Sequence, residues 1–111
     1  MRGSQEKQQY VSKILDFYLR LPETPFRFSR TDVELTRQLY EDKVRQEDIE
    51  LAMILASLRR AYPKNGPLGP IRSLHYFLPV LQEIRRESSP ASYRQYLRTK
   101  FEKLMDQRKI P

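Results

Sequence analysis

Residues 46–61 read QEDIELAMILASLRRA, and this stretch decides the fold. Its apolar side chains surround nearly the whole circumference of a helix, as Ile49, Leu51, Ala52, Met53, Ile54, Leu55, Ala56 and Leu58. A helix that is apolar on almost every side has to be buried on most sides. We therefore expect residues 46–61 to form the central, third helix of a bundle, with Arg59, Arg60 and Tyr62 emerging at its end.

Two helices are predicted before this stretch. The first spans about 5–21, where apolar residues recur at helical spacing and Pro22 and Pro25 end the pattern. The second spans about 29–43, with Ser29 as its cap and Asp32 completing a capping box. Phe28 and Val33 are spaced as a hydrophobic staple across this start. The core-facing residues of the second helix should be Val33, Thr36, Leu39, Tyr40 and Val44.

Two further helices follow a loop over 62–70 that contains three prolines and two glycines. The fourth spans about 71–86, and Pro79 should kink it or divide it. The fifth begins at Ser89 and Pro90, which are typical of a helix start, and runs to about 107. Its expected apolar face consists of Tyr93, Leu97, Phe101 and Leu104.

A chain of 111 residues fits one domain. We expect an all-α, compact single-domain bundle of about five helices over 5–108, and interpret 1–4 as a tag remnant or a disordered end. The sequence has no cysteine, no apolar run of roughly 20 residues and no secretory signal. These features predict a cytoplasmic protein without a membrane partner. The oligomeric state, and whether the chain is a whole protein or a fragment, stay open.

The residue types argue against catalysis. His75 is the single histidine, so a Cys/His zinc site and a serine–histidine triad lack their parts. No glycine-rich phosphate motif occurs. The carboxylates between Glu41 and Glu50 are explained by a solvated helix junction. We expect no catalytic, cofactor or metal site, and no enzymatic activity.

The charge distribution suggests an anionic partner. The net charge is +7, and residues 63–111 carry ten basic against four acidic side chains. Such asymmetry suggests nucleic acid, a membrane surface or an acidic protein. The apolar third helix is unsuited to reading base edges, so we assign the basic surface to the last two helices. The predicted nucleic-acid-binding residues are Arg72, Tyr76, Arg85, Arg86, Arg94, Arg98 and Lys103.

In this set the cations would contact phosphates, while Tyr76, or Tyr93 or Tyr96, would stack on an unpaired base. Long basic side chains also commonly cover the edges of an apolar stripe, which is the structural explanation for the same residues.

The block from Asp48 to Ile84 resembles the helical domain of DnaD-like bacterial replication proteins. Its hallmark is Y-x-x-x-I-x-x-x-W, and Tyr76, Val80 and Ile84 occupy that spacing. Valine replaces the isoleucine, Ile84 stands at the tryptophan position, and about a third of the chain is covered. The resemblance implies an accessory role in primosome or plasmid replication. It also implies DNA contact through Tyr76, Arg85 and Arg86, with other replication proteins as further partners.

The sequence thus predicts a DNA-binding accessory protein of bacterial replication or a mobile element. It would contact phosphates with weak sequence preference, and single- or double-stranded DNA remain alternatives. The competing hypothesis is a helical adaptor that binds an acidic helix or tail of another protein.

Overall fold

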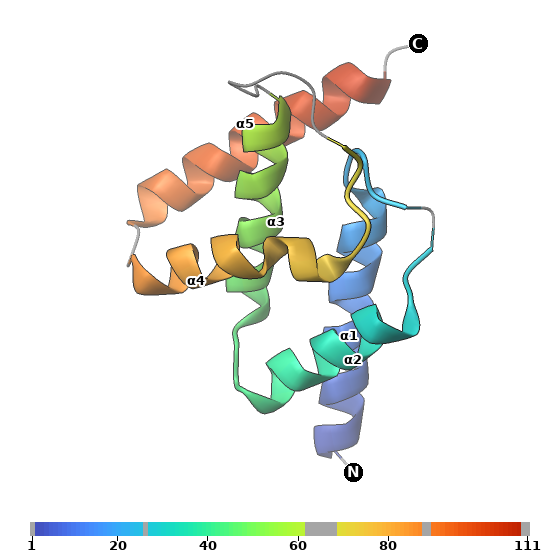
Figure 1. The fold of residues 1–111 in the computed structure, drawn as a ribbon. Coiled ribbons are helices and arrows are strands. Elements are labelled where there is room, and N and C mark those ends of the chain that lie inside the picture. Colours follow the sequence, from blue (N-terminus) through green and yellow to red (C-terminus); the bar gives the residue numbers. More distant parts are fainter. Residues whose placement is uncertain (1, 26, 62–68, 88–89, 110–111) are drawn as a thin grey trace.

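The computed structural model describes residues 2–25, 27–61, 69–87 and 90–109 (Figure 1). Within these ranges the chain forms five α-helices, one short 3-10 helix and no strand. The elements are α1 (Arg2–Arg20), α2 (Arg30–Glu41), α3 (Gln46–Ala61), η1 (Leu74–Phe77), α4 (Leu78–Arg86) and α5 (Ala91–Lys109). The predicted all-α class is confirmed, and α1 begins three residues earlier than expected.

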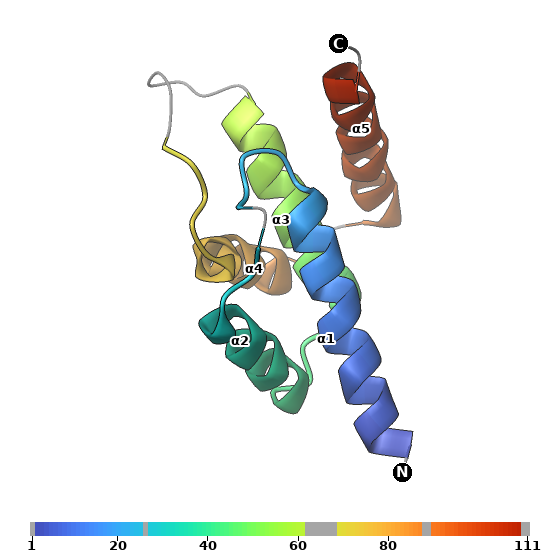
Figure 2. The same cartoon turned by 90° about the vertical axis from the view of Figure 1, so that its right-hand side faces the viewer.

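Helix α3 is the centre of the molecule, as its sequence predicts. Every residue from Leu51 to Leu58 is buried. Helices α1, α4 and α5 and the short η1 all pack against it. In Figures 1 and 2, α4 and α5 cross α3 on opposite sides, and α1 runs beside it. Burial at roughly 25 cal/mol per Å² of apolar surface makes this helix the main source of stability.

Proline and local backbone geometry set the ends of two helices. Residues 71–73 are not helical, and Pro79 is the second residue of α4, where its missing N–H costs no hydrogen bond. Pro79 therefore divides the predicted fourth helix into η1 and α4. Helix α2 ends just before Lys43, whose φ of 60° is the left-handed conformation that commonly terminates a helix. Ser89 lies outside the described residues.

Three expectations about burial are wrong. Val33 is only half-buried and lines a surface groove with the exposed Phe28. Tyr93 is 42% exposed, so it stands outside the apolar face of α5. Arg60, expected to emerge from α3, is 8% exposed.

The buried carboxylate of Asp32 joins α2 to η1. Ser29 and Asp32 form the predicted capping box: Ser29 N–H donates to Asp32 Oδ2 at 2.9 Å, and Asp32 N–H donates to Ser29 Oγ at 3.2 Å. Asp32 Oδ1 also accepts from the Leu74 backbone N–H at 2.9 Å. Burial, and secondarily this carboxylate, raises the pKa of the Tyr18 phenol to about 12.

The guanidinium of Arg60, in the last turn of α3, connects this helix to three other segments. It donates to Glu23 Oε2 at 2.9 Å, to the Tyr76 hydroxyl at 3.1 Å and to the Gly69 carbonyl oxygen. It also lies over the Tyr76 ring, 5.3 Å from its centroid. One arginine thereby fixes the segment after α1 and the segment that leads into η1.

We predict that Asp32→Ala lowers the free energy of unfolding by about 2 kcal/mol, because it leaves two backbone donors without an acceptor. Asp32→Asn should cost less, since an amide oxygen can still accept one of the two bonds. Urea unfolding measures both. Glu34→Ala on the exposed side of α2 is the control, with an expected change within about 0.5 kcal/mol. Equal losses at the two positions would contradict the role of Asp32.

Candidate nucleic-acid interface

The seven residues predicted to bind nucleic acid do not share one surface. They fall into three groups: Arg94 and Arg98 turn toward α3, Arg72 and Tyr76 lie before α4, and Arg85, Arg86 and Lys103 are exposed at the end of α4 and on α5. Each group has a different set of neighbours. These neighbours decide which of the seven side chains are available to an external phosphate.

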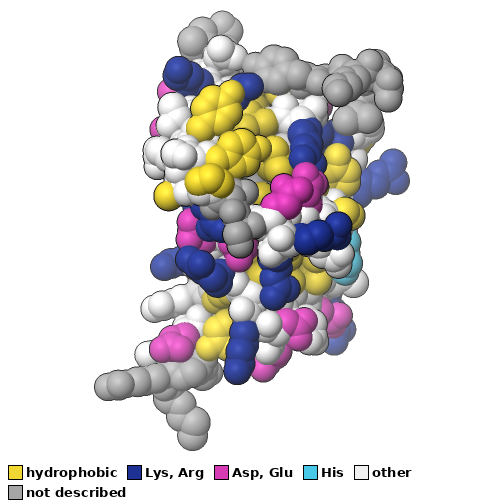
Figure 3. All heavy atoms as spheres, turned by 90° about the vertical axis from the view of Figure 1, so that its left-hand side faces the viewer, with side chains coloured by type: hydrophobic (Ala, Val, Ile, Leu, Met, Phe, Trp, Pro, Cys, Tyr) yellow, Lys and Arg dark blue, Asp and Glu magenta, His cyan; other side chains and the backbone are white. Residues whose placement is uncertain are grey.

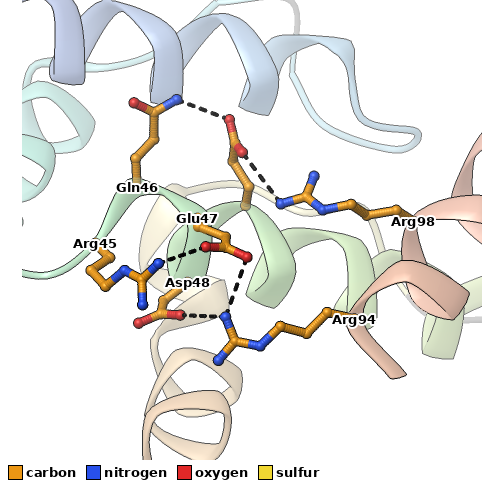
Figure 4. A network of polar contacts seen from close by, with 7 residues as sticks. Arg45, Gln46, Glu47, Asp48, Arg94 and Arg98 are labelled. Carbon is orange, nitrogen blue, oxygen red and sulfur yellow. Dashed lines mark hydrogen bonds and ion pairs between the residues drawn. The ribbon is translucent and has the colours of Figure 1, made fainter. Parts of the chain in front are cut away.

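Arg94 and Arg98 form ion pairs with the first turns of α3 (Figure 4). Arg94 Nη1 is 3.3 Å from Glu47 Oε1 and 3.6 Å from Asp48 Oδ1, and Arg98 Nη2 is 3.8 Å from Glu50 Oε2. Both arginine side chains are less than a third exposed. Glu47, Asp48 and Glu50, which the sequence placed at a solvated junction, are therefore partners of α5. These two arginines contribute little positive potential to the outside.

Arg72 and Tyr76 lie at the other end of the η1–α4 segment. Ten residues separate Tyr76 from Arg86, which corresponds to roughly 15 Å of helix. Tyr76 is 42% exposed, but its hydroxyl and one ring face are engaged by Arg60, and Phe77 packs edge-on against it. These contacts give the Tyr76 side chain a structural role in the fold. Arg72 is exposed and has no ion pair with a described carboxylate.

Arg85 and Arg86 are exposed in the last turn of α4, and neither forms an ion pair with a described residue. Arg85 faces the turn between α2 and α3. Burial raises the pKa of the Tyr10 phenol, the Arg85 charge opposes that rise, and the Asp42 charge adds to it. Tyr10 donates to the Val44 carbonyl at 2.7 Å, which fixes this turn beside the end of α4.

The end of α4 and the start of α5 flank one ion pair. Arg59 near the end of α3 donates to Glu83 on α4 through two hydrogen bonds, the longer one 2.9 Å. The hydrogen bonds from Arg59 lower the pKa of Glu83, and the nearby Arg86 adds to this effect. Tyr93 and Glu87 in turn raise the pKa of Arg59, after the larger effect of Glu83. Arg86 and Tyr93 are thus both near the Arg59–Glu83 pair.

We call the solvent-accessible residues at the ends of α3 and α4 and along the outer side of α5 the α4–α5 face: Arg59, Glu83, Arg85, Arg86, Glu87, Tyr93, Tyr96, Lys100 and Lys103. Figure 3 shows the side of the molecule where the two helices meet, with basic and acidic side chains across its middle and a hydrophobic patch above. Arg85, Arg86 and Lys103 belong to the predicted binding residues, and Tyr93 and Tyr96 were predicted as alternative stacking residues. The signal that finds Tyr93, Tyr96, Lys100 and Lys103 together is their alternating spacing of three and four residues.

The described residues offer little else for ligand chemistry. They contain no group of three or more histidine, cysteine, aspartate or glutamate side chains placed to hold a metal ion. Among them, no helix has the length and apolar character needed to cross a membrane. A groove of about 590 Å³ lies between α1 and α2. In Figure 1, α1 lies to the right of α3, whereas the end of α4 and the start of α5 lie to its left.

Comparison with protein-family models, curated proteins and solved structures finds no match for this chain. The resemblance of the block from Asp48 to Ile84 to DnaD-like proteins therefore stays a prediction.

The burial of Asp48 gives a test of the structural role of Arg94. Asp48 Oδ1 is buried without a hydrogen bond, and Arg94 is its ion-pair partner. Arg94→Gln should lower the free energy of unfolding by about 1–2 kcal/mol, because it leaves that oxygen uncompensated. The loss should shrink when Asp48→Asn is already present, which a double-mutant cycle by urea unfolding measures. Additive effects would mean that the pair does not stabilise the fold.

The Arg59–Glu83 pair predicts a pH dependence. The pKa of Glu83 is lowered in the folded state, so the pair stabilises above the unfolded pKa of about 4.3 and is lost as pH falls through the folded value. Glu83→Gln should therefore be less stable than the parent protein near neutral pH. This difference in stability should disappear in acid. Thermal unfolding across pH tests this, with Glu102→Gln on α5 as an exposed control. A gap that does not change with pH would contradict the assignment.

Proposed function

We propose that this protein binds DNA through the α4–α5 face, as an accessory protein of bacterial replication or of a mobile element. The observation that carries the proposal is the arginine pair at the end of α4. Arg85 and Arg86 are exposed, adjacent and without a carboxylate partner among the described residues, whereas Arg94 and Arg98 are held by α3. Phosphate contacts from such side chains are strong at low salt and insensitive to base sequence.

The charge of the face supports a contact of moderate strength. It carries five basic and two acidic side chains, and one of the carboxylates, Glu83, is engaged by Arg59. A mixed surface of this kind fits non-specific affinity in the micromolar range or weaker, on the order of 10⁻⁴–10⁻⁶ M at physiological salt. The implied role beside other replication proteins rests on the DnaD-like resemblance.

The adaptor hypothesis is favoured by a different surface. The α1–α2 groove is lined by apolar Val11, Leu15, Phe28 and Val33, and by Lys7 and Arg37 at its rim. This composition suits the apolar face of a partner helix, with acidic residues at its edges. We place this function second because Lys7 is already paired with Glu41 and Asp16 also lines the groove.

The test of DNA binding is a charge-matched comparison. Replacement of Arg85 and Arg86 by glutamine should weaken binding of a labelled oligonucleotide and lower the slope of log K against log salt by about two units. Replacement of Lys13 and Arg20 by glutamine removes the same charge from α1, which lies on the other side of α3. This variant should change the slope of log K against log salt little. Fluorescence anisotropy at several salt concentrations measures both the affinity and the salt slope of each variant.

Equal effects of the two double variants would mean that net charge alone drives binding, which contradicts a site at the end of α4. If no oligonucleotide binds at low salt, the DNA proposal fails and the groove between α1 and α2 becomes the leading candidate.

A further inference from the structure

Two exposed tyrosines stand side by side at the start of α5. Tyr93 is 42% and Tyr96 55% exposed, and they are two of four large hydrophobic side chains exposed among the described residues. Their ring centroids are 6.4 Å apart, and the ring planes are inclined by 26°. The ammonium of Lys100 lies over the Tyr96 ring, 5.8 Å from its centroid. The rings thus form a roughly parallel pair with a cation at one end.

The charged side chains of α5 are distributed unevenly around the helix. At 3.6 residues per turn, Tyr93, Tyr96, Lys100 and Lys103 follow one another along a single side of the helix. Glu102 lies on another side, Asp106 lies beyond Lys103 at the end of the helix, and Arg94 and Arg98 point to α3. The result is an exposed stripe of two aromatic rings followed by two cations, with no acidic residue of α5 within it.

The stripe continues across the α4–α5 face. Tyr93 is near enough to Arg59 for the two charges to interact, and Arg59 donates to Glu83 on α4. Arg86 is exposed three residues after Glu83 on the same helix. Basic side chains of α3 and α4 therefore accompany the lysines of α5 on this face.

Ring stacking distinguishes unpaired bases from paired ones. In a duplex the base faces are covered by neighbouring base pairs, so exposed tyrosine rings can meet only backbone or groove edges. In a single strand each base offers a free face, and aromatic side chains beside a basic groove are the common solution for binding it. A protein partner would not require two lysines to follow the two tyrosines along the same side of the helix.

We infer that the stripe of Tyr93, Tyr96, Lys100 and Lys103 binds single-stranded nucleic acid. Unpaired bases stack against the tyrosine pair, where a base on Tyr96 takes the place of the Lys100 ammonium. The two lysines then contact the phosphates that follow. This inference rests on the proposed function and narrows its substrate to unpaired strands.

The experiment compares two single strands of equal charge. One is an oligothymidine of about 15 nucleotides, and the other has the same backbone with abasic sites in place of the bases. The parent protein should bind the first at least about 10-fold more tightly, because only that strand can stack. Tyr93→Ala with Tyr96→Ala should remove this preference, while affinity for the abasic strand stays nearly constant.

Two matched variants complete the test. Tyr93→Phe with Tyr96→Phe keeps both rings and should keep the preference for the oligothymidine over the abasic strand. Phe28→Ala removes an aromatic side chain of similar exposure on the other side of the molecule, and should leave both affinities unchanged. Circular dichroism confirms that each variant is folded, which the exposure of the replaced rings leads us to expect.

The outcomes separate this inference from the function on which it rests. Binding that depends on Arg85 and Arg86 but is indifferent to the bases and to the tyrosines would overturn the inference alone. Tighter binding of a duplex of the same length than of the oligothymidine would also overturn it. Absence of binding to any strand would overturn the DNA proposal and the inference together, and the tyrosine pair would then belong to a protein contact.

Discussion

The burial of α3 on nearly its whole circumference governs the rest of the structure. Residues 51–58 are all buried, so other elements have to cover every side of this helix. Helices α1, α4 and α5 do so from different directions. A short chain can provide this cover only if each surrounding helix gives one apolar side to α3. The opposite sides of α4 and α5 are then left to solvent, and the exposed charges lie there.

The ends of α3 determine which of these charges stay available. Its first turns carry Glu47, Asp48 and Glu50, which suit the helix dipole and pair with the two arginines of α5. Its last turn carries Arg59 and Arg60, which pair with Glu83 and Glu23. Two of the ten basic side chains in residues 63–111, Arg94 and Arg98, are thereby paired with carboxylates of α3. Among the described residues of the same stretch, exposed basic side chains lie at Arg72, at the end of α4 and along one side of α5.

Local patterns in the sequence predicted the elements well, because they depend on neighbours in the chain. The capping box at Ser29, the division at Pro79 and the central place of α3 all follow from spacing or from backbone chemistry. Side-chain partners from distant elements were not predictable in the same way. The ion pairs of Arg94 and Arg98, and the burial of Arg60, depend on the angles at which α5 and the 69–76 segment cross α3. Tyr93 fits the apolar period of α5, yet its side chain is 42% exposed.

The arginines held by α3 also have a consequence for the exposed side of α5. This helix packs mainly against α3, through Leu97 and Leu104, with Phe101 stacked on Phe17 of α1. Apolar contacts alone permit a helix some rotation about its own axis, since they are not directional. The hydrogen bond from Arg94 to Glu47 is directional, and together with the ion pair between Arg98 and Glu50 it favours one rotation of α5. The side that carries the two tyrosines and two lysines is thereby held outward, so residues that contact no ligand themselves decide what α5 presents to one.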